Sequence, residues 1–220
     1  KSNPIICNTT FIKYLTKRAE KLGVEILSGY RYIENEGKHI KIKNLETKEI
    51  IELQDNKIIG ADGPSSNVAK NNMLYENKRE FLTGVQARVK LKDFDKTKIE
   101  FYPYIGEYAW FTPESDEIAR IGVAARAEQN PKRIFDDFMK KYVGAESKHK
   151  GQILEMQGGP IPLHKPKTPV RFKYKNFSAT LIGDSALQIK NTTGGGIIPG
   201  MKAAKILSEN FETYPVSLSK

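Results

Sequence analysis

The sequence predicts a mixed α/β fold that contains antiparallel sheet. Three observations support this prediction: apolar residues recur at helical spacing near both ends of the chain, short β-rich runs alternate with turn residues between them, and two apolar strands lead through glycine-rich turns into helices. With 220 residues, 39% of them hydrophobic, the chain is long enough to bury a substantial core, as one large domain or two small ones.

The first part of the chain is predicted to begin with an amphipathic helix over residues 9–22, which Gly23 ends. Short runs rich in β-branched and aromatic residues follow, separated by turn residues. We expect these runs to form a small antiparallel meander over residues 24–27, 30–35, 39–44 and 49–53. An apolar strand then enters a glycine-rich turn.

The middle of the chain contains four further strand-like runs, for which an antiparallel sheet is the simplest arrangement: residues 81–91, 98–104, 107–113 and 117–125. Pro131 opens a predicted helix over residues 131–142, because the first turn of a helix does not need the N–H that proline lacks. Beyond it, Pro160, Pro162, Pro166 and Pro169 predict that residues 158–169 run as an extended connection. A short buried strand over residues 179–184 and a helix over residues 197–210 follow.

The charge of +10 is spread along the chain and not gathered in one block. A basic surface attracts phosphates, anionic lipids and nucleic acid alike, but solvated lysines on an ordinary surface are the favoured explanation. Since charge alone would support a nucleic-acid partner, we expect none. Cys7 has no second cysteine with which to pair, and His39, His149 and His164 form no ligand-spaced pair, so no metal site is expected. A single cysteine and no membrane-length apolar run predict a cytoplasmic protein.

A first candidate binding segment is Ile58–Ser66, an apolar strand that runs into a glycine-bracketed turn and then a helix. Glycines at such a turn let a ligand approach the backbone, the carboxylate of Asp62 can accept hydrogen bonds, and a helix N-terminus favours an anion. A tight turn with a serine cap on the helix is the alternative that needs no ligand.

A second candidate segment begins at Asp184, which follows a predicted buried strand and precedes the glycines of a helix start. A carboxylate at the end of such a strand can bind a sugar hydroxyl, and glycines at a helix start expose backbone N–H groups to an anionic group. A flexible loop before a surface helix is the alternative. Three consecutive glycines are costly in conformational entropy, however, and this favours a functional reason for them.

The order of GADGPSS, LIGDSA and a trailing GGG resembles the second and third FAD-binding motifs of the flavoproteins that include aromatic hydroxylases, halogenases and geranylgeranyl reductases. The resemblance implies an FAD/NAD(P)-binding-type fold with an antiparallel substrate-domain sheet. It implies that Asp62 and Gly63 lie near the pyrophosphate and ribityl side of FAD, and that Asp184 bonds the ribityl or phosphate region. The last helix would meet the flavin with its N-terminus, whose dipole stabilises an anionic reduced flavin, through Gly194, Gly195, Gly196 and Ile197.

Two further segments narrow the resemblance to geranylgeranyl reductases. Residues 108–113, YAWFTP, look like the aromatic YxWxFP strand that lines the isoprenoid cavity of that family, although Thr112 stands where the pattern has Phe. On this resemblance Tyr108, Trp110 and Pro113 contact the substrate; an aromatic strand that fills a core is the alternative. Residues 158–162, GGPIP, resemble the bend that precedes the GD strand in the same family.

Two departures from the family pattern concern the start of the chain. Asn8 stands where the family usually has an arginine, and no GxGxxG occurs, so the unit that binds the ADP half of FAD is not recognisable. We therefore expect a fold that is incomplete at its N-terminus, and a chain, beginning at Lys1, that is the C-terminal portion of such an enzyme. Cys7 matches no family motif and is expected to be a buried small hydrophobe.

The resemblance implies an FAD-binding domain over residues 1–75 and 170–220 and a substrate domain over residues 76–169. The implied activity is FAD-dependent saturation of C=C bonds in prenyl (geranylgeranyl) chains of isoprenoid lipids, with NAD(P)H or ferredoxin as external electron donor. No side chain stands out as a proton donor, so the catalytic residues are unknown. The implied partners are the prenyl lipid, an N-terminal FAD-binding segment and an anionic membrane surface. A flavin monooxygenase of the aromatic-hydroxylase type and a non-catalytic split subunit are the alternatives.

Overall fold

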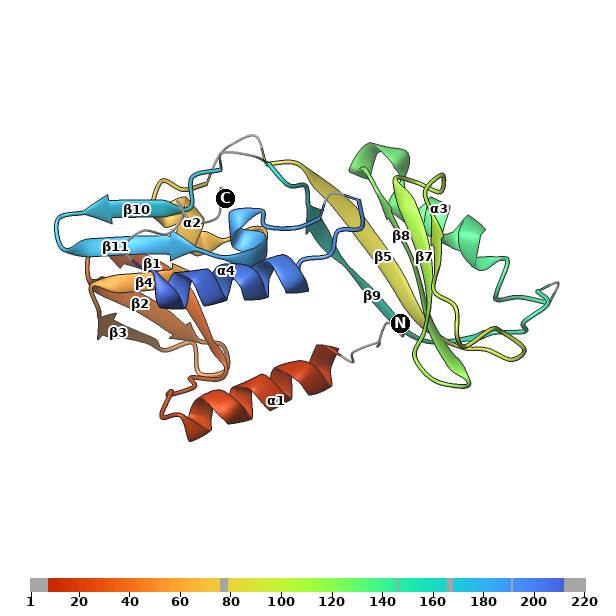
Figure 1. Ribbon diagram of the computed structural model, residues 1–220, viewed down its shortest axis with the longest axis horizontal. Helices are drawn as coiled ribbons and strands as arrows, with labels where there is room; N and C mark the ends of the chain where they lie inside the picture. Colours follow the sequence, from red (N-terminus) through yellow and green to blue (C-terminus); the bar gives the residue numbers. More distant parts are fainter. Residues whose placement is uncertain (1–7, 76–78, 146, 166–167, 191, 212–220) are drawn as a thin grey trace. The chain divides into compact units, whose positions relative to one another are not determined.

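The computed structural model of the chain describes residues 8–75, 79–145, 147–165, 168–190 and 192–211 (Figure 1). The chain has the predicted mixed α/β fold with antiparallel sheets and separates into two compact units. We call Lys1–Leu27 with Leu82–Pro160 the five-stranded unit, and Ser28–Phe81 with Ile161–Lys220 the two-sheet unit. The first helix is grouped with the five-stranded unit, and the chain changes unit after Leu27, Phe81 and Pro160. The assignment of residues 1–75 and 170–220 to an FAD-binding domain and of residues 76–169 to a substrate domain stays a prediction.

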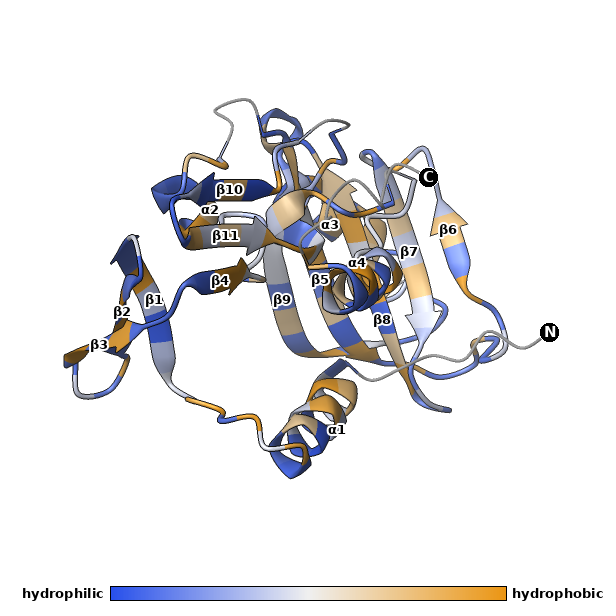
Figure 2. Ribbon diagram, turned by 60° about the vertical axis from the view of Figure 1, so that its left-hand side comes forward, coloured by the Kyte–Doolittle hydropathy of each residue, from blue (hydrophilic) through white to orange (hydrophobic). Residues whose placement is uncertain are grey.

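The five-stranded unit is built on one sheet with the strand order β6-β7-β8-β5-β9. Its strands are β5 (Phe81–Lys90), β6 (Glu100–Tyr102), β7 (Tyr108–Pro113), β8 (Ile118–Ala125) and β9 (Gln152–Pro162). From β6 to β5 the neighbours are antiparallel, as predicted. Figure 2 shows these strands striped by hydropathy, because successive side chains point to opposite faces of a sheet.

One face of this sheet is buried by α3 (Pro131–Met139), which follows the short 3-10 helix η1 (Ala127–Gln129). The side chain of Asn130 caps α3 by accepting a hydrogen bond from the backbone N–H of Arg133 at 3.2 Å. Phe135, on the inner side of α3, is 1% exposed and packs in a core with Phe111 and Ile121 of the sheet. The opposite face of the sheet is therefore the one free to carry a site.

The two-sheet unit contains the predicted meander, β1 (Tyr30–Glu36), β2 (His39–Asn44) and β3 (Ile50–Gln54), paired antiparallel. Its second sheet has the order β10-β11-β4, with β10 (Arg171–Tyr174), β11 (Phe177–Leu181) and β4 (Lys57–Gly60). Strand β11 runs parallel to β4. The helices α2 (Asn67–Asn71) and α4 (Ile197–Glu209) pack on this sheet through a core that includes Val68, Leu181, Ala203 and Leu207.

Two predictions about local structure were wrong. Residues 24–27 form no strand, because no described strand pairs with them, and Val24, Ile26 and Leu27 are exposed. The segment that begins at Gly158 is not only a connection, because residues 158–162 belong to β9. As β9 is an edge strand, its prolines remove no hydrogen bond from the interior of the sheet. Strand β10 was not predicted.

The remaining helices agree with the sequence pattern. The first helix, α1 (Asn8–Lys21), forms where predicted, and none of its residues is buried. A one-turn 3-10 helix, η2 (Gly183–Ala186), follows β11. None of the helices in the described part of the chain is long and apolar enough to cross a membrane. The prediction for Cys7 and the position of Pro166 lie outside the described residues.

Candidate functional site

The two candidate motifs meet at one edge of the small sheet. Because β4 and β11 are parallel neighbours with Gly60 opposite Leu181, the turns that follow them begin side by side. The backbone N–H of Ile182 donates to the carbonyl of Gly60 at 3.0 Å. The hydroxyl of Ser185, which is fully buried, lies 2.6 Å from the same carbonyl oxygen and 2.7 Å from that of Ile182. These bonds hold the two strand ends together.

Asp62 organises the turn after β4 by capping α2. One carboxylate oxygen accepts a hydrogen bond from the Ser66 hydroxyl at 2.5 Å, and the other accepts from the backbone N–H groups of Asn67 and Val68 at 2.8 and 3.2 Å. Gly63 follows with φ of +80°, in the left-handed region that favours glycine. The carboxylate of Asp62 is thus committed to the helix, and its contact with a cofactor stays a prediction.

Asp184 lies against the N-terminus of α4. A Cβ atom added to Gly196, the residue that caps α4, would come within 2.5 Å of Asp184 Oδ1, so only glycine allows this approach. Gly196 has no side chain with which to cap the helix, so it leaves N–H groups of the first turn available. Burial raises the pKa of the Asp184 carboxyl.

The glycines ahead of α4 form a tight loop. The backbone N–H of Gly194 donates to the carbonyl of Lys190 at 2.8 Å, and the N–H of Lys190 donates to the carbonyl of Gly195 at 3.2 Å. Gly194 has φ of +62°. Ile197, the first residue of α4, is 51% exposed. The structure therefore places all predicted cofactor residues in the two-sheet unit, and brings Asp184 and Gly196 into direct contact.

Arg79 supports this site but was not predicted from the sequence. The residue is 8% exposed, and its guanidinium donates to the carbonyl oxygens of Pro64 and Leu74 at 3.2 and 3.3 Å and lies 4.3 Å from the ring centre of Tyr75. Arg79 thus braces the turn that contains Gly63. It lies beyond the motif and belongs to no periodic pattern, so the sequence carries no signal for this role.

Two further residues support the turn after β11. The side-chain oxygen of Gln188 accepts a hydrogen bond from the backbone N–H of Gly183 at 2.8 Å. His164 Nδ1 lies 2.9 Å from the carbonyl oxygen of Leu187, a fully buried residue with φ of +55°. These contacts hold η2, and with it Asp184, in place.

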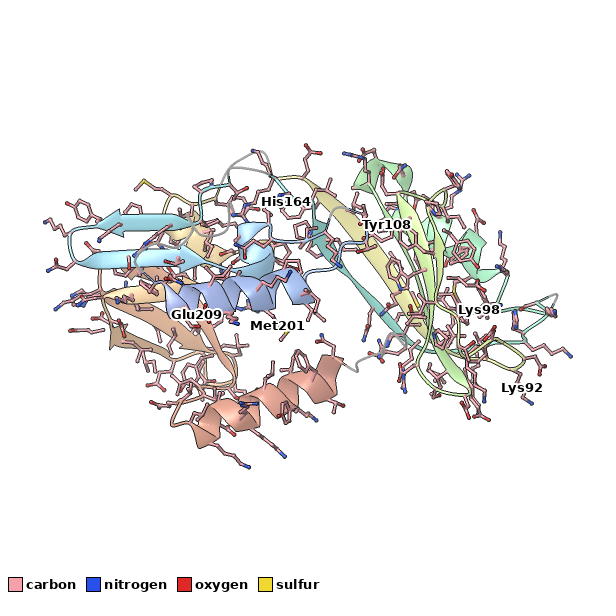
Figure 3. All side chains as sticks on the ribbon, viewed as in Figure 1. Lys92, Lys98, Tyr108, His164, Met201 and Glu209 are labelled. Carbon is pink, nitrogen blue, oxygen red and sulfur yellow. The ribbon has the colours of Figure 1, made fainter. Side chains whose placement is uncertain are left out.

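The predicted substrate residues lie in the five-stranded unit and do not share one face of the sheet. Tyr108 and Trp110 alternate along β7 with residues that belong to the core under α3, so they point to the opposite face. Tyr108 is labelled in Figure 3. Pro113 pairs with the core residue Ala119, and so lies on the α3 face. The rings of Tyr108 and Trp110 are 5.9 Å apart.

The aromatic face contains one buried polar atom that its neighbours do not satisfy. The hydroxyl of Tyr108 is buried and has no hydrogen-bond partner among the described residues. Burial raises the pKa of this phenol, so it stays protonated at neutral pH. Tyr108 also stacks on Phe101, with ring centres 5.4 Å apart. A protonated hydroxyl therefore lies within an otherwise aromatic surface.

A charged cluster follows the aromatic residues on the same face. Glu114 accepts hydrogen bonds from Arg88 Nε at 2.9 and 3.0 Å and pairs with Arg120 Nε at 2.9 Å. The hydrogen bond from Arg88 is the main cause that lowers the pKa of Glu114. No group of His, Cys, Asp and Glu residues in the described ranges is arranged to hold a metal ion.

No family model matches the chain. Curated proteins do match it: the digeranylgeranylglycerophospholipid reductase of Thermoplasma acidophilum is 26% identical over 229 residues, covering 94% of this chain and 55% of that protein. The geranylgeranyl diphosphate reductase of Synechocystis sp. is 27% identical over 221 residues, covering 90% and 51%. The chain is similar to geranylgeranyl reductases over most of its length. It spans about half the length of these curated relatives.

Solved structures confirm the predicted fold of the chain. A geranylgeranyl bacteriochlorophyll reductase-like protein from Thermoplasma acidophilum matches with a TM-score of 0.72 and 23% identity, covering 97% of this chain and 58% of that one. The myxobacterial chondrochloren halogenase, described as a variant of FAD-dependent halogenases, matches with a TM-score of 0.67 and 14% identity, covering 93% and 51%. The fold is therefore that of FAD-dependent flavoproteins, as the motifs predicted.

Proposed function

We propose that the chain is part of an FAD-dependent reductase that saturates C=C bonds of prenyl chains. The observation that carries this proposal is the contact between Asp184 and Gly196, which sets a half-buried carboxylate beside an uncapped helix N-terminus at the ends of two parallel strands. The names of the curated relatives, both prenyl reductases, support the substrate class.

The residues present fit an FAD group. Asp184 would accept a hydrogen bond from a ribityl hydroxyl, an interaction that also compensates the burial of its carboxylate. The N–H groups at the start of α4 would face the anionic edge of a reduced flavin, where the helix dipole favours negative charge. Gly63 would allow close approach of the turn that Asp62 and Arg79 hold. When bound, a reduced flavin supplies the hydride.

The aromatic face of the five-stranded unit is proposed to hold the prenyl chain. Trp110 and Phe101 offer apolar surface, and Phe101 is 44% exposed in the structure. Such a surface excludes water from an alkene and gains free energy by covering it. Since Pro113 lies on the α3 face, we propose that it supports β7 instead of touching the substrate.

A complementary FAD-binding segment is the proposed partner of the two-sheet unit. Within the described part of the chain, β4 is an edge strand with one unpaired side, and Ile59 on it is 48% exposed. An unpaired edge of this kind readily accepts another strand. The charge of +10 supports a peripheral contact with an anionic membrane surface of the cytoplasm, where a prenyl lipid would be met.

The cofactor proposal is tested by titrating the purified chain with FAD and recording the flavin absorption spectrum. We expect a protein-bound spectrum for the wild type and at least about tenfold weaker binding for Asp184→Ala, because the variant loses a hydrogen bond to a charged group. Asp116→Ala, at an exposed aspartate paired with Lys96, is the control and should bind as the wild type does. FAD binding by Asp184→Ala equal to that of the wild type would contradict the assignment of Asp184.

The reaction is tested by reducing bound FAD chemically without oxygen and adding geranylgeranyl diphosphate. A product heavier by two hydrogen atoms per bond supports prenyl reduction and does not depend on knowing the electron donor. Product that forms only with oxygen would indicate a monooxygenase. Flavin binding that requires an added complementary segment would favour a split subunit. FAD-loaded protein that yields no product in any of these conditions would contradict the proposal.

A further inference from the structure

Trp110, the single tryptophan of the chain, lies across the middle of the five-stranded sheet. On β8 it faces Gly122, and Gln86 of β5 faces Gly122 from the other side. A Cβ atom added to Gly122 would come within 2.2 Å of Trp110 Cζ2, so the indole rests directly on the backbone of β8. From there the indole Nε1–H reaches Gln86 Oε1 at 3.0 Å. One side chain thus spans three strands.

The amide of Gln86 is held in the orientation that accepts the indole N–H. Its Nε2 donates to Gln157 Oε1 of β9 at 3.0 Å, and Arg120 Nη1 donates to the same oxygen at 3.2 Å. Arginine has only donors, so Arg120 requires an oxygen from Gln157. Because the Gln157 oxygen is an acceptor, Gln86 must turn its NH₂ group toward it. The Gln86 oxygen then faces Trp110 and accepts the indole N–H. The direction of each bond follows from the one before it.

Arg120 is itself fixed at the end of this series of hydrogen bonds. Its Nε pairs with Glu114 at 2.9 Å, and Glu114 also binds Arg88. The Arg120 and Glu114 side chains are 30% and 22% exposed, so the pair is partly shielded from water. Gln157 itself is exposed, so water competes least for the Arg120–Glu114 part of the network. The charged cluster therefore anchors the glutamines, and the glutamines anchor the indole.

We propose that Gln86 is a positioning residue of the prenyl site, which locks the indole of Trp110 flat on Gly122 as a fixed wall for the substrate chain. The proposal rests on the proposed function and deepens it. Without the hydrogen bond from the indole N–H to Gln86, the indole keeps its apolar surface but can rotate away from Gly122. A mobile indole would have to be ordered when the prenyl chain binds, and this would weaken binding. Gln86 therefore acts by holding the indole in its binding position before the substrate arrives.

The fluorescence of Trp110 tests this proposal in the full chain, because no other tryptophan contributes to the signal. We compare Gln86→Leu, which removes the acceptor at similar size, with Gln86→Glu, which keeps one, and with Gln152→Leu, at an exposed position of the same sheet. Acrylamide quenching and fluorescence anisotropy report how firmly the indole is held. Titration with geranylgeranyl diphosphate reports binding.

We expect Gln86→Leu to increase quenching, lower the anisotropy and weaken prenyl binding about two- to tenfold, as the loss of one hydrogen bond predicts. In turnover its KM should rise by a similar factor while kcat changes little, because the wall is used equally in the ground and transition states. Gln86→Glu keeps the acceptor for Trp110 but loses the Nε2 donor that binds Gln157, so its signals should lie between those of the wild type and those of Gln86→Leu. Gln152→Leu should keep the wild-type signals.

Gln86→Leu with quenching, anisotropy and binding like the wild type would overturn the proposal. So would a Gln86→Glu variant as mobile as Gln86→Leu, provided that circular dichroism shows both folded. If the prenyl compound leaves the wild-type fluorescence unchanged, the prenyl site of the proposed function fails at Trp110. In that case the contrast in quenching between Gln86→Leu and Gln86→Glu still decides whether Gln86 holds the indole.

Discussion

Two glycines of this protein matter because they have no side chain. Gly122 and Gly196 each allow a functional side chain to come closer than any Cβ atom would permit, Trp110 in the first case and Asp184 in the second. Neither glycine has a positive φ, so contact and not backbone conformation requires it. An alanine at Gly122 would have to displace the indole ring, whereas an alanine at Gly196 would only have to turn the end of the Asp184 side chain.

Gly122→Ala should displace the indole of Trp110 and lower the free energy of unfolding by about 1–3 kcal/mol, because the new methyl group would lie only 2.2 Å from Trp110 Cζ2. Chemical denaturation measures the stability, and the emission of Trp110 reports the displacement. Gly159→Ala is the matched control, since an added Cβ there meets nothing within 4 Å. Equal effects of the two substitutions would show that Trp110 does not rest on Gly122.

Asp184 should make the folded state less stable as pH rises. Burial raises its pKa in the folded chain, so the folded state holds the proton more tightly than the unfolded state does. The resulting stability is complete below the unfolded pKa of about 3.9 and is lost as pH rises through the folded pKa. Asp184→Asn should remove this slope and be at least as stable as the wild type at neutral pH, while FAD binding weakens.

Urea denaturation at several pH values between about 3 and 7 measures this difference. Asp116→Asn, at an exposed position, is expected to keep the slope of the wild type. If wild type and Asp184→Asn lose stability in parallel as pH rises, the carboxylate of Asp184 is not the group responsible.

The elements of the small sheet determine how the candidate site is assembled. The parallel pairing of β4 with β11 places the turns that follow them at one edge, and no local feature of either segment requires that. The bonds from Ser178 N–H to Asn56 O and from Ile182 N–H to Gly60 O mark the two ends of this pairing. In a parallel ladder alternate residues bond to the neighbour, so Ile58 faces β11 and the N–H of Ile59 points to the unpaired side.

Proline scanning tests this arrangement with two adjacent positions. Ile58→Pro should lose a ladder bond and disrupt the site, with a cost of about 1–3 kcal/mol for the buried carbonyl left without its donor. Ile59→Pro should leave the chain folded, because proline is tolerated on the outer side of an edge strand. Circular dichroism and FAD binding measure both variants. Equal damage by the two prolines would mean that the N–H of Ile59 is not free for a further strand.

The molecule as a whole is strongly basic, with 36 lysine and arginine residues against 26 aspartate and glutamate residues. Many ion pairs of the described residues are short-range pairs on the surface, such as Lys132 with Asp136, and contribute little to stability. The excess charge therefore matters chiefly for association with anionic surfaces.

Binding to lipid vesicles should show this association. We expect the chain to sediment with vesicles that contain an anionic phospholipid, to ignore neutral vesicles, and to be released as salt rises to about 1 M, where screening extends only about 3 Å. Salt-resistant binding to both kinds of vesicle would point instead to insertion of apolar side chains such as Ile198 and Met201, which are 54% and 50% exposed. Met201 is labelled in Figure 3.

The sequence by itself determined the elements whose signals are local. The helical period of α1 and α4, the proline at the start of α3 and the alternation in β5 to β8 predicted these elements near their observed ranges. The order of the GADG and GD motifs also predicted the flavoprotein fold, which the solved structures confirm. The contact roles of Asp62 and Asp184 stay predictions, although the structure brings both motifs to one edge.

Only the tertiary structure decided the features that depend on a partner distant in the sequence. Residues 24–27 have the composition of a strand but form none, since a strand needs a neighbour to pair with its backbone. Arg79 braces the Gly63 turn, and Gln86 holds Trp110, through contacts that no local pattern encodes. A side chain's role is set by what lies within a few ångströms of it, and chain folding chooses those neighbours.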